Sequence, residues 1–186
     1  MIHEAKLRLL LPLVFSFVSG AVAAQVDKTA MLAGLDRDFD RYQAIAHTLW
    51  ANPELGYLEK ESARLLQATL EDEGFRVESG VAGIPTAFTA SFGSGKPVIG
   101  ILGEYDALPG MSQAAVPYEA SLAEGAPGQA CGPHLFGAGS LAAAIAVKNW
   151  LRESGAAGTI RFYGTPAEAG GSGKVSMVRA GRFNDV

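Results

Sequence analysis

A thiol and an imidazole lie close together at the start of a long apolar stretch. Residues 128–137 contain Cys131, the single cysteine of the chain, and His134, and they lead into an apolar run from 135 to 151. We expect this loop at the N-terminus of a buried helix, a place that favours anions, thiolates and metal ions. The alternative is an ordinary helix start in which the thiol packs as a small apolar group.

The order Cys131-Gly132-Pro133-His134 resembles the dithiol redox loop of thioredoxin-like proteins, with a histidine in place of the second cysteine. A thiol beside an imidazole at a helix start is often reactive. The chain has no second thiol to resolve a disulfide, and the long loop before Cys131 does not suit that fold. Thiol redox or thiol-nucleophile chemistry at Cys131 is therefore kept as a minor alternative.

Three carboxylates follow apolar segments that read as strands. Glu104 and Asp106 come directly after the unbroken apolar run 98–102, and Glu168 follows residues 159–163. The run 98–102 is typical of a strand buried on both faces in the middle of a parallel or mixed sheet. Open α/β sheets bind ligands at the carboxyl ends of their strands. We therefore expect the three carboxylates at one rim of the sheet.

The periodicity of the remaining apolar residues predicts the elements that hold this rim. Helices are predicted over residues 35–50, 59–73 and 135–153, strands over 75–79, 87–92, 97–102 and 159–163, a hairpin or short turn over 93–95, and a long surface loop over 111–127. This alternation predicts an α/β fold, a three-layer sandwich with a parallel or mixed central sheet and helices on both faces. So few strands should leave an unpaired sheet edge.

Composition limits the class of protein and of partner. The 186 residues, of which 48% are hydrophobic, suit one globular domain and exclude a disordered or fibrous protein. The formal net charge of −4 argues against nucleic acid or an anionic membrane as a partner.

The N-terminus has the pattern of an export signal. Lys6 and Arg8 precede an apolar run over 9–18, and Ala21-Val22-Ala23 supplies small residues for cleavage. This run is shorter than the roughly 20 residues that span a bilayer, so an uncleaved anchor is the weaker interpretation. We expect residues 1–23 to be a signal peptide and the mature chain to be periplasmic or secreted, without a membrane anchor. In an exported protein, Cys131 is then a free thiol, a metal ligand or half of an intermolecular pair.

Three ordered motifs carry a family resemblance. Residues 104–110 (EYDALPG), 130–137 (ACGPHLFG) and 165–168 (TPAE), each after its expected element, resemble the dinuclear-metal aminoacylase and carboxypeptidase superfamily. Residues 52–56 and 83–87 are also similar to its amidohydrolase branch, which includes aminobenzoyl-glutamate, hippurate and auxin-conjugate hydrolases. The resemblance implies that residues 24–186 are the N-terminal part of a catalytic domain, without the lid domain and the C-terminal part. It leaves an oligomer open.

The resemblance implies metal-assisted hydrolysis of an amide bond in an N-acyl amino acid or an aminobenzoyl-glutamate type substrate. Two divalent ions, zinc or manganese, would polarise the carbonyl and activate a water molecule. By the same resemblance, Cys131 matches a thiolate metal ligand and Glu168 the general base. Asp106 matches the acidic residue of the first motif, with Glu104 as a further carboxylate at the rim.

The chain departs from the family at the metal ligands. Gln129 and Pro133 occupy the two histidine positions of the family loop, and Ala169 replaces the glutamate beside the base. His134 is a possible substitute ligand, but one step along a helix turns a side chain by about 100°. We therefore expect an amidohydrolase whose metal site is dismantled and which is inactive as this chain alone. A degenerate, non-catalytic remnant or binding module is the alternative.

Overall fold

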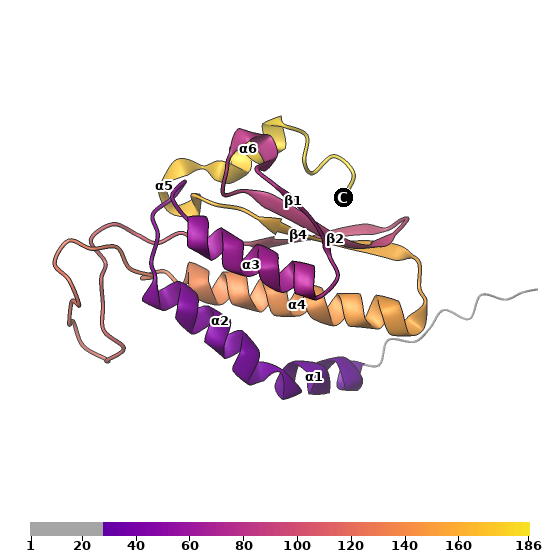
Figure 1. Cartoon of the computed structure of the whole chain (residues 1–186), viewed down its shortest axis with the longest axis horizontal. Coiled ribbons are helices and arrows are strands. Elements are labelled where there is room, and N and C mark those ends of the chain that lie inside the picture. The colour runs from indigo at the N-terminus through magenta and orange to yellow at the C-terminus, as the bar shows by residue number, and fades with distance from the viewer. Residues whose placement is uncertain (1–27) are drawn as a thin grey trace, which may run out of the picture.

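A four-stranded mixed sheet carries the fold (Figure 1). The computed structural model describes residues 28–186, so the predicted signal peptide lies outside the described residues. The strands are β1 (Arg76–Ser79), β2 (Phe88–Ser94), β3 (Val98–Gly103) and β4 (Gly158–Gly164), in the spatial order β1-β2-β4-β3. β2 is antiparallel to both β1 and β4, whereas β3 and β4 are parallel. The predicted mixed α/β sheet is confirmed.

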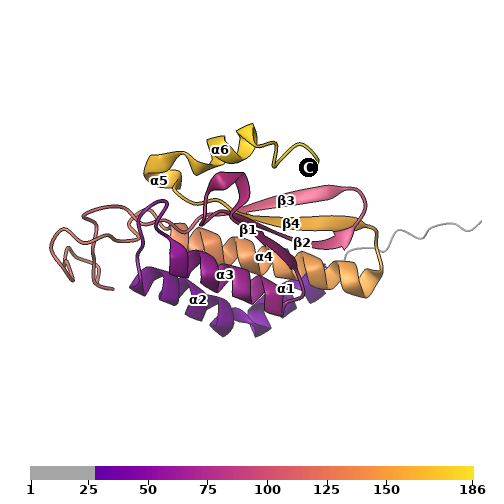
Figure 2. The ribbon, with the colours of Figure 1, turned by 45° about the horizontal axis from the view of Figure 1, so that its top comes forward.

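Helices lie on both faces of this sheet (Figure 2). One face carries α1 (Lys28–Arg37), α2 (Phe39–Ala51), α3 (Lys60–Asp72) and α4 (Pro133–Ser154); the short α5 (Glu168–Gly171) and α6 (Gly173–Arg179) lie on the other side, near the 3₁₀ turn η1 (Val81–Gly83). This is the predicted three-layer sandwich. No helix of residues 28–186 is long and apolar enough to cross a membrane.

Adjacent residues of β4 point to opposite faces and fill two separate cores. Phe162 is fully buried with Leu66 and Leu141 on the side of the long helices. Tyr163 is fully buried on the other side, where it packs with Met177 of α6. Because β4 is buried on both faces and paired at both edges, it is the central strand that fixes the rim.

Two strand predictions are wrong. The run 98–102 was expected in the middle of the sheet, but β3 is an edge strand and Ile99 is 54% exposed. Of the two interpretations of 93–95, the hairpin is wrong, because β4 lies between β2 and β3; residues 93–94 end β2, and a short connection over 95–97 leads to β3. The reason is the crossover through α4. It brings the chain back parallel to β3 and inserts β4 between β2 and β3. β3 thus provides the unpaired edge that so small a sheet was expected to leave.

The predicted helix over 35–50 is also corrected, since it is two helices. α1 ends at Arg37, and Asp38 leaves the helical conformation with ψ near +10° before α2 begins. The helix expected over 59–73 and the one expected from 135 match α3 and α4 closely. Residues 111–127 form the predicted long loop without helix or strand, which projects from the end of the molecule where α2 ends and α4 begins (Figure 1).

Candidate active site

The carboxyl ends of β3 and β4 meet at one rim, as the sequence predicted. The strands are parallel and in register from Val98 with Thr159 to Gly103 with Gly164. Just past the strands, the backbone N–H of Thr165 donates to the Gly103 carbonyl at 2.9 Å, and the Thr165 hydroxyl donates to the same oxygen at 3.1 Å. The segments that carry Asp106 and Glu168 therefore leave the sheet side by side.

Asp106 anchors the backbone at Glu168. The residue is only 1% exposed, and its two carboxylate oxygens accept hydrogen bonds from the backbone N–H of Glu168, at 3.0 Å, and of Ala169, at 2.9 Å. Both carboxylate oxygens are thus occupied by main-chain donors. The Glu168 residue is exposed at the rim, so Asp106 holds its backbone while the carboxylate of Glu168 stays accessible.

A second buried carboxylate, Glu59, holds the same segment and was missed in the sequence, where it marked only the start of a helix. Glu59 is fully buried, and its carboxylate accepts from the Ala167 N–H at 2.8 Å and from the Thr86 hydroxyl at 3.0 Å. Burial raises the pKa of Glu59, although these hydrogen bonds oppose the rise. The Tyr105 hydroxyl donates to the Thr86 carbonyl at 2.6 Å and joins the first motif to this network.

No local pattern in the sequence could have identified Glu59 as part of the site. The N-terminus of α3 is in fact capped by Glu54, whose carboxylate accepts from the Glu61 N–H and from both the N–H and the hydroxyl of Ser62. The residue just before a helix often makes such bonds with its own side chain, but Glu59 makes none of them. Because Glu54 does it instead, Glu59 is free to turn inward to a segment 108 residues later in the chain.

The three positions at which the family resemblance predicts a metal ligand, and the chain has another residue, have structural roles. Gln129 is buried; its amide donates to the Tyr105 carbonyl at 3.3 Å and accepts from the His134 N–H at 3.2 Å, so it caps the start of α4. Pro133 opens α4, where the missing N–H costs nothing. Ala169 contributes only its backbone N–H, to Asp106.

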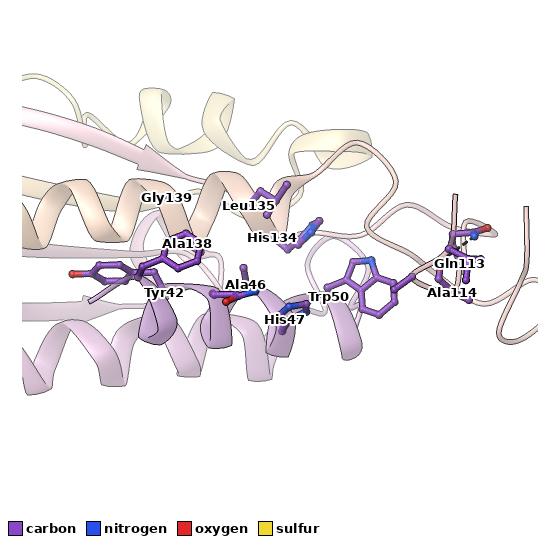
Figure 3. Close-up of a pocket in the computed structure, with 14 residues that line it drawn as sticks. Tyr42, Ala46, His47, Trp50, Gln113, Ala114, His134, Leu135, Ala138 and Gly139 are labelled. Carbon is purple, nitrogen blue, oxygen red and sulfur yellow. Dashed lines mark hydrogen bonds between the residues drawn. The ribbon is translucent and has the colours of Figure 1, made fainter. Parts of the chain in front are cut away.

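The remaining predicted site residues do not come together. Cys131 is an exposed free thiol, and within residues 28–186 no side chain bonds to it. Glu104 forms an ion pair with Lys174 of α6. His134 points from α4 towards α2, beside His47 (Figure 3). Burial lowers the pKa of His134, and the neighbouring His47 lowers it further, so the imidazole is neutral at pH 7.

These residues do not fit a dinuclear metal centre. Among the described residues, no three side chains of the types His, Cys, Asp and Glu are grouped so that they could hold a metal ion. The chemistry of the donor set agrees, because Asp106 is occupied by backbone donors, Glu104 is paired with a lysine, and Gln129 binds main-chain atoms. What the rim does present is an exposed carboxylate, Glu168, on a backbone fixed by two buried acids.

Comparisons with known proteins give consistent relatives. The chain is 52% identical over 153 residues to one of the subunits of the p-aminobenzoyl-glutamate hydrolase of Escherichia coli strain K12, a match that covers 82% of this chain and 32% of that protein. It is 32% identical over 181 residues to IAA-amino acid hydrolase ILR1-like 4 of Arabidopsis thaliana, with 97% of this chain and 40% of the relative covered. The chain thus spans about a third of the length of such curated relatives. No family model matches the sequence.

The fold has solved counterparts as well. A dinuclear metal-binding peptidase of the M20 family from Bacillus subtilis superimposes with a TM-score of 0.69 at 28% identity, over 81% of this chain and 42% of that chain.

Proposed function

Because the chain belongs to the M20 peptidase and amidohydrolase family, we propose that it is part of a hydrolase that cleaves the amide bond of an N-acyl amino acid of the aminobenzoyl-glutamate type. The observation that carries this proposal is the exposed Glu168 carboxylate, whose backbone is fixed by the buried Asp106 at the carboxyl ends of β3 and β4. The 52% identity to a p-aminobenzoyl-glutamate hydrolase supports the choice of substrate class.

In this proposal Glu168 is the general base. An exposed carboxylate at the rim can take a proton from the water that attacks the amide carbonyl. Asp106 and Glu59 are positioning residues, because they hold the three successive backbone N–H groups of residues 167–169. Relatives of this chain include a dinuclear metal-binding peptidase, and zinc or manganese would supply the Lewis acid in a member of the family that binds metal.

We propose further that this chain alone does not turn over such a substrate. Gln129, Pro133 and Ala169 offer no imidazole or carboxylate, and a dinuclear site needs several such ligands. A non-catalytic remnant or binding module is the alternative that this proposal leaves open. Thiol chemistry at Cys131 has less support, since within residues 28–186 the thiol has no imidazole or other base hydrogen-bonded to it.

Measurement of bound zinc tests whether the metal site expected from the family lies at this rim. The unaltered chain should retain less than one equivalent of zinc after dialysis, whereas the triple variant Gln129→His, Pro133→His and Ala169→Glu should bind at least one. The added variant Cys131→Ser should then lose that zinc, and Co²⁺ loaded in its place should lose its thiolate absorption band. A triple variant that gains no metal, or binds it without Cys131, would contradict the assignment of this rim.

An assay of p-aminobenzoyl-glutamate hydrolysis, in which the p-aminobenzoate released is measured, tests the activity. The unaltered chain with added zinc or manganese should match the blank. Turnover that is lost on Glu168→Gln would refute the proposed inactivity and at the same time support Glu168 as the base. Turnover that survives Glu168→Gln would contradict the role of that residue.

The cellular location is also a proposal. We infer that residues 1–23 direct export, on the strength of Lys6 and Arg8, the apolar run and the small residues at 21–23. N-terminal sequencing of the protein recovered from a periplasmic or culture fraction should begin near residue 24. Recovery of a chain that still begins at Met1 would contradict cleavage.

A further inference from the structure

The two edges of the sheet differ in how well they are protected (Figure 2). β1 forms one edge; it has only four residues, and Arg76 and Glu78 on it are exposed. β3 forms the other edge, and its six residues, Val98–Gly103, include neither a charged residue nor a proline. Natural sheets protect their edges with charges, prolines or short strands, because an open edge pairs readily with another strand. The β3 edge has none of these devices.

Every second residue of β3 faces this open edge. The Pro97 carbonyl, just before the strand, accepts from the Thr159 N–H at 2.9 Å. The Gly103 carbonyl, at the end of the strand, accepts from the Thr165 N–H, also at 2.9 Å. In a parallel ladder alternate residues bond to the neighbouring strand, so the odd-numbered residues of β3 bond to β4. The outward residues, which turn their N–H and C=O groups to the open edge, are Val98, Gly100 and Leu102.

An exposed apolar side chain lies beside these outward groups. A Cβ at Gly100 would lie 3.0 Å from the ring of Tyr163, so the outward residues direct their side chains to the side of α6. Ile99 and Ile101 therefore point to the side of the long helices, where Ile101 packs against the core. Ile99 is 54% exposed. A strand that paired with β3 would cover this side chain.

We propose that two copies of this chain pair through β3, antiparallel and with a two-fold axis at Gly100, and so form one continuous sheet. Backbone hydrogen bonds across the edge join outward residues to outward residues. With the axis at Gly100, Val98 pairs with Leu102 of the second copy, and all the outward residues are used. A shift of the second copy by two residues would leave one of them without an outward partner.

The same register matches the side chains. Ile99 lies opposite Ile101 of the second copy in a non-hydrogen-bonded pair, in which the Cα atoms are about 4.5 Å apart and the side chains are closest. Cross-strand pairs of β-branched residues stabilise a sheet. Lys96, exposed just before the strand, lies opposite Glu104 of the second copy, whose side chain is 20% exposed beside Lys174. The charges at the two ends of β3 are therefore complementary in an antiparallel pair, whereas a parallel pair would bring like charges together.

This pairing ends at the dimer. Once the two β3 edges are joined, the edges of the combined sheet are the two copies of β1, which are short and charged. A two-fold interface is self-complementary and closed, so we expect a dimer and not a fibre. The inference does not rest on the proposed hydrolase function, because it depends only on the edge of the sheet.

Sedimentation equilibrium of the full chain tests the association, and we expect a monomer–dimer equilibrium. Ile99→Lys places a charge in the apolar pair twice in each dimer and should raise the dissociation constant about 100-fold, about tenfold for each copy. Leu122→Lys is the matched control, because Leu122 is 70% exposed in the loop 111–127, and it should leave the dissociation constant unchanged. Far-UV circular dichroism should show that both variants are folded.

Cysteine cross-linking tests the register. All variants carry Cys131→Ser, so that the native thiol does not react. Ile99→Cys combined with Ile101→Cys should form an intermolecular disulfide on mild oxidation, because Cα atoms about 4.5 Å apart suit such a bond. Each of the two single variants should remain without a cross-link, because its two thiols are diagonal neighbours whose Cα atoms are about 7–8 Å apart.

The other outcomes overturn the proposal. A chain that stays monomeric up to its solubility limit does not pair through β3. A dimer that survives Ile99→Lys has its interface elsewhere, and if that variant does not fold, the cross-linking decides alone. A cross-link in Ile99→Cys alone, or in Ile101→Cys alone, would place the two-fold axis at that residue instead of at Gly100. Absence of a cross-link in the double variant would exclude the proposed register.

Discussion

Replacing Glu59 by alanine should destabilise the protein strongly, although the residue looks like an ordinary helix start in the sequence. The change leaves the Ala167 N–H and the Thr86 hydroxyl without an acceptor, and both residues are buried. Each buried group left without a partner costs about 1–3 kcal/mol of stability. The variant no longer has to bury a carboxylate, and this gain offsets part of that cost. We expect Glu59→Ala to lower the free energy of unfolding by about 3 kcal/mol at pH 7.

Glu59→Gln separates the charge from the hydrogen bonds. The glutamine keeps one acceptor for the Ala167 N–H, and its amide N–H can donate to the Thr86 hydroxyl, so the cost should be about 1 kcal/mol. Glu61→Gln is a control in the first turn of the same helix, because Glu61 is exposed and pairs only with Arg64 at the surface. That change should stay within about 0.5 kcal/mol.

The pH dependence of Glu59→Gln relative to the unaltered chain follows from the raised pKa of Glu59. Between the ordinary pKa of glutamate, about 4.3, and the raised value in the folded state, the native chain binds more protons than the unfolded chain. Stability from this group therefore falls as pH rises through that window, and it is highest below it. In urea denaturation from pH 4 to 7, the free energy of unfolding of Glu59→Gln should rise relative to that of the unaltered chain as the pH increases.

A difference in free energy of unfolding that stays constant from pH 4 to 7 would refute the reasoning, because it would mean that burial does not raise the pKa of Glu59. A Glu59→Ala variant within about 1 kcal/mol of the unaltered chain would refute the assignment of two buried hydrogen bonds to this carboxylate.

Two further pairs of variants test the packing between the helices and within the sheet. Glu73→Ala should cost about 3 kcal/mol, because it leaves the Lys148 ammonium, only 4% exposed, without the carboxylate that it meets at 2.6 Å, whereas Lys148→Met should cost less than about 1 kcal/mol. Urea titration of both variants measures the asymmetry, and equal losses would contradict it. Gly164→Ala should cost about 2 kcal/mol, since its Cβ would lie 2.1 Å from the ring of Phe88, whereas Gly139→Ala should be neutral or stabilising in a helix with open space. Thermal unfolding distinguishes the two, and a similar melting temperature for both would contradict the predicted clash.

The sequence was sufficient for features that depend on neighbouring residues. The period of α3 and α4 and the position of Pro133 at the first turn of α4 follow from local patterns, and the structure has them. The meeting of Asp106 and Glu168 at one rim follows from the rule that parallel strands end at the same edge. The edge position of β3 could not be obtained in this way, because strand order depends on the crossover through α4 rather than on the residues of the strand.

The site shows how the scaffold can hold without the metal ligands that the family resemblance predicts. Gln129 stands where that resemblance predicts an imidazole, yet it satisfies the His134 N–H at the start of α4 and the Tyr105 carbonyl beside Asp106. The side chain at this position thus has a hydrogen-bonding role, and the helix that follows Cys131 keeps its cap. Meanwhile Asp106 and Glu59 stabilise the Glu168 segment through backbone N–H groups, which no substitution at Ala169 other than proline can remove. The rim therefore keeps its shape independently of any metal ion, which is why restoring three side chains is a meaningful test of the metal site.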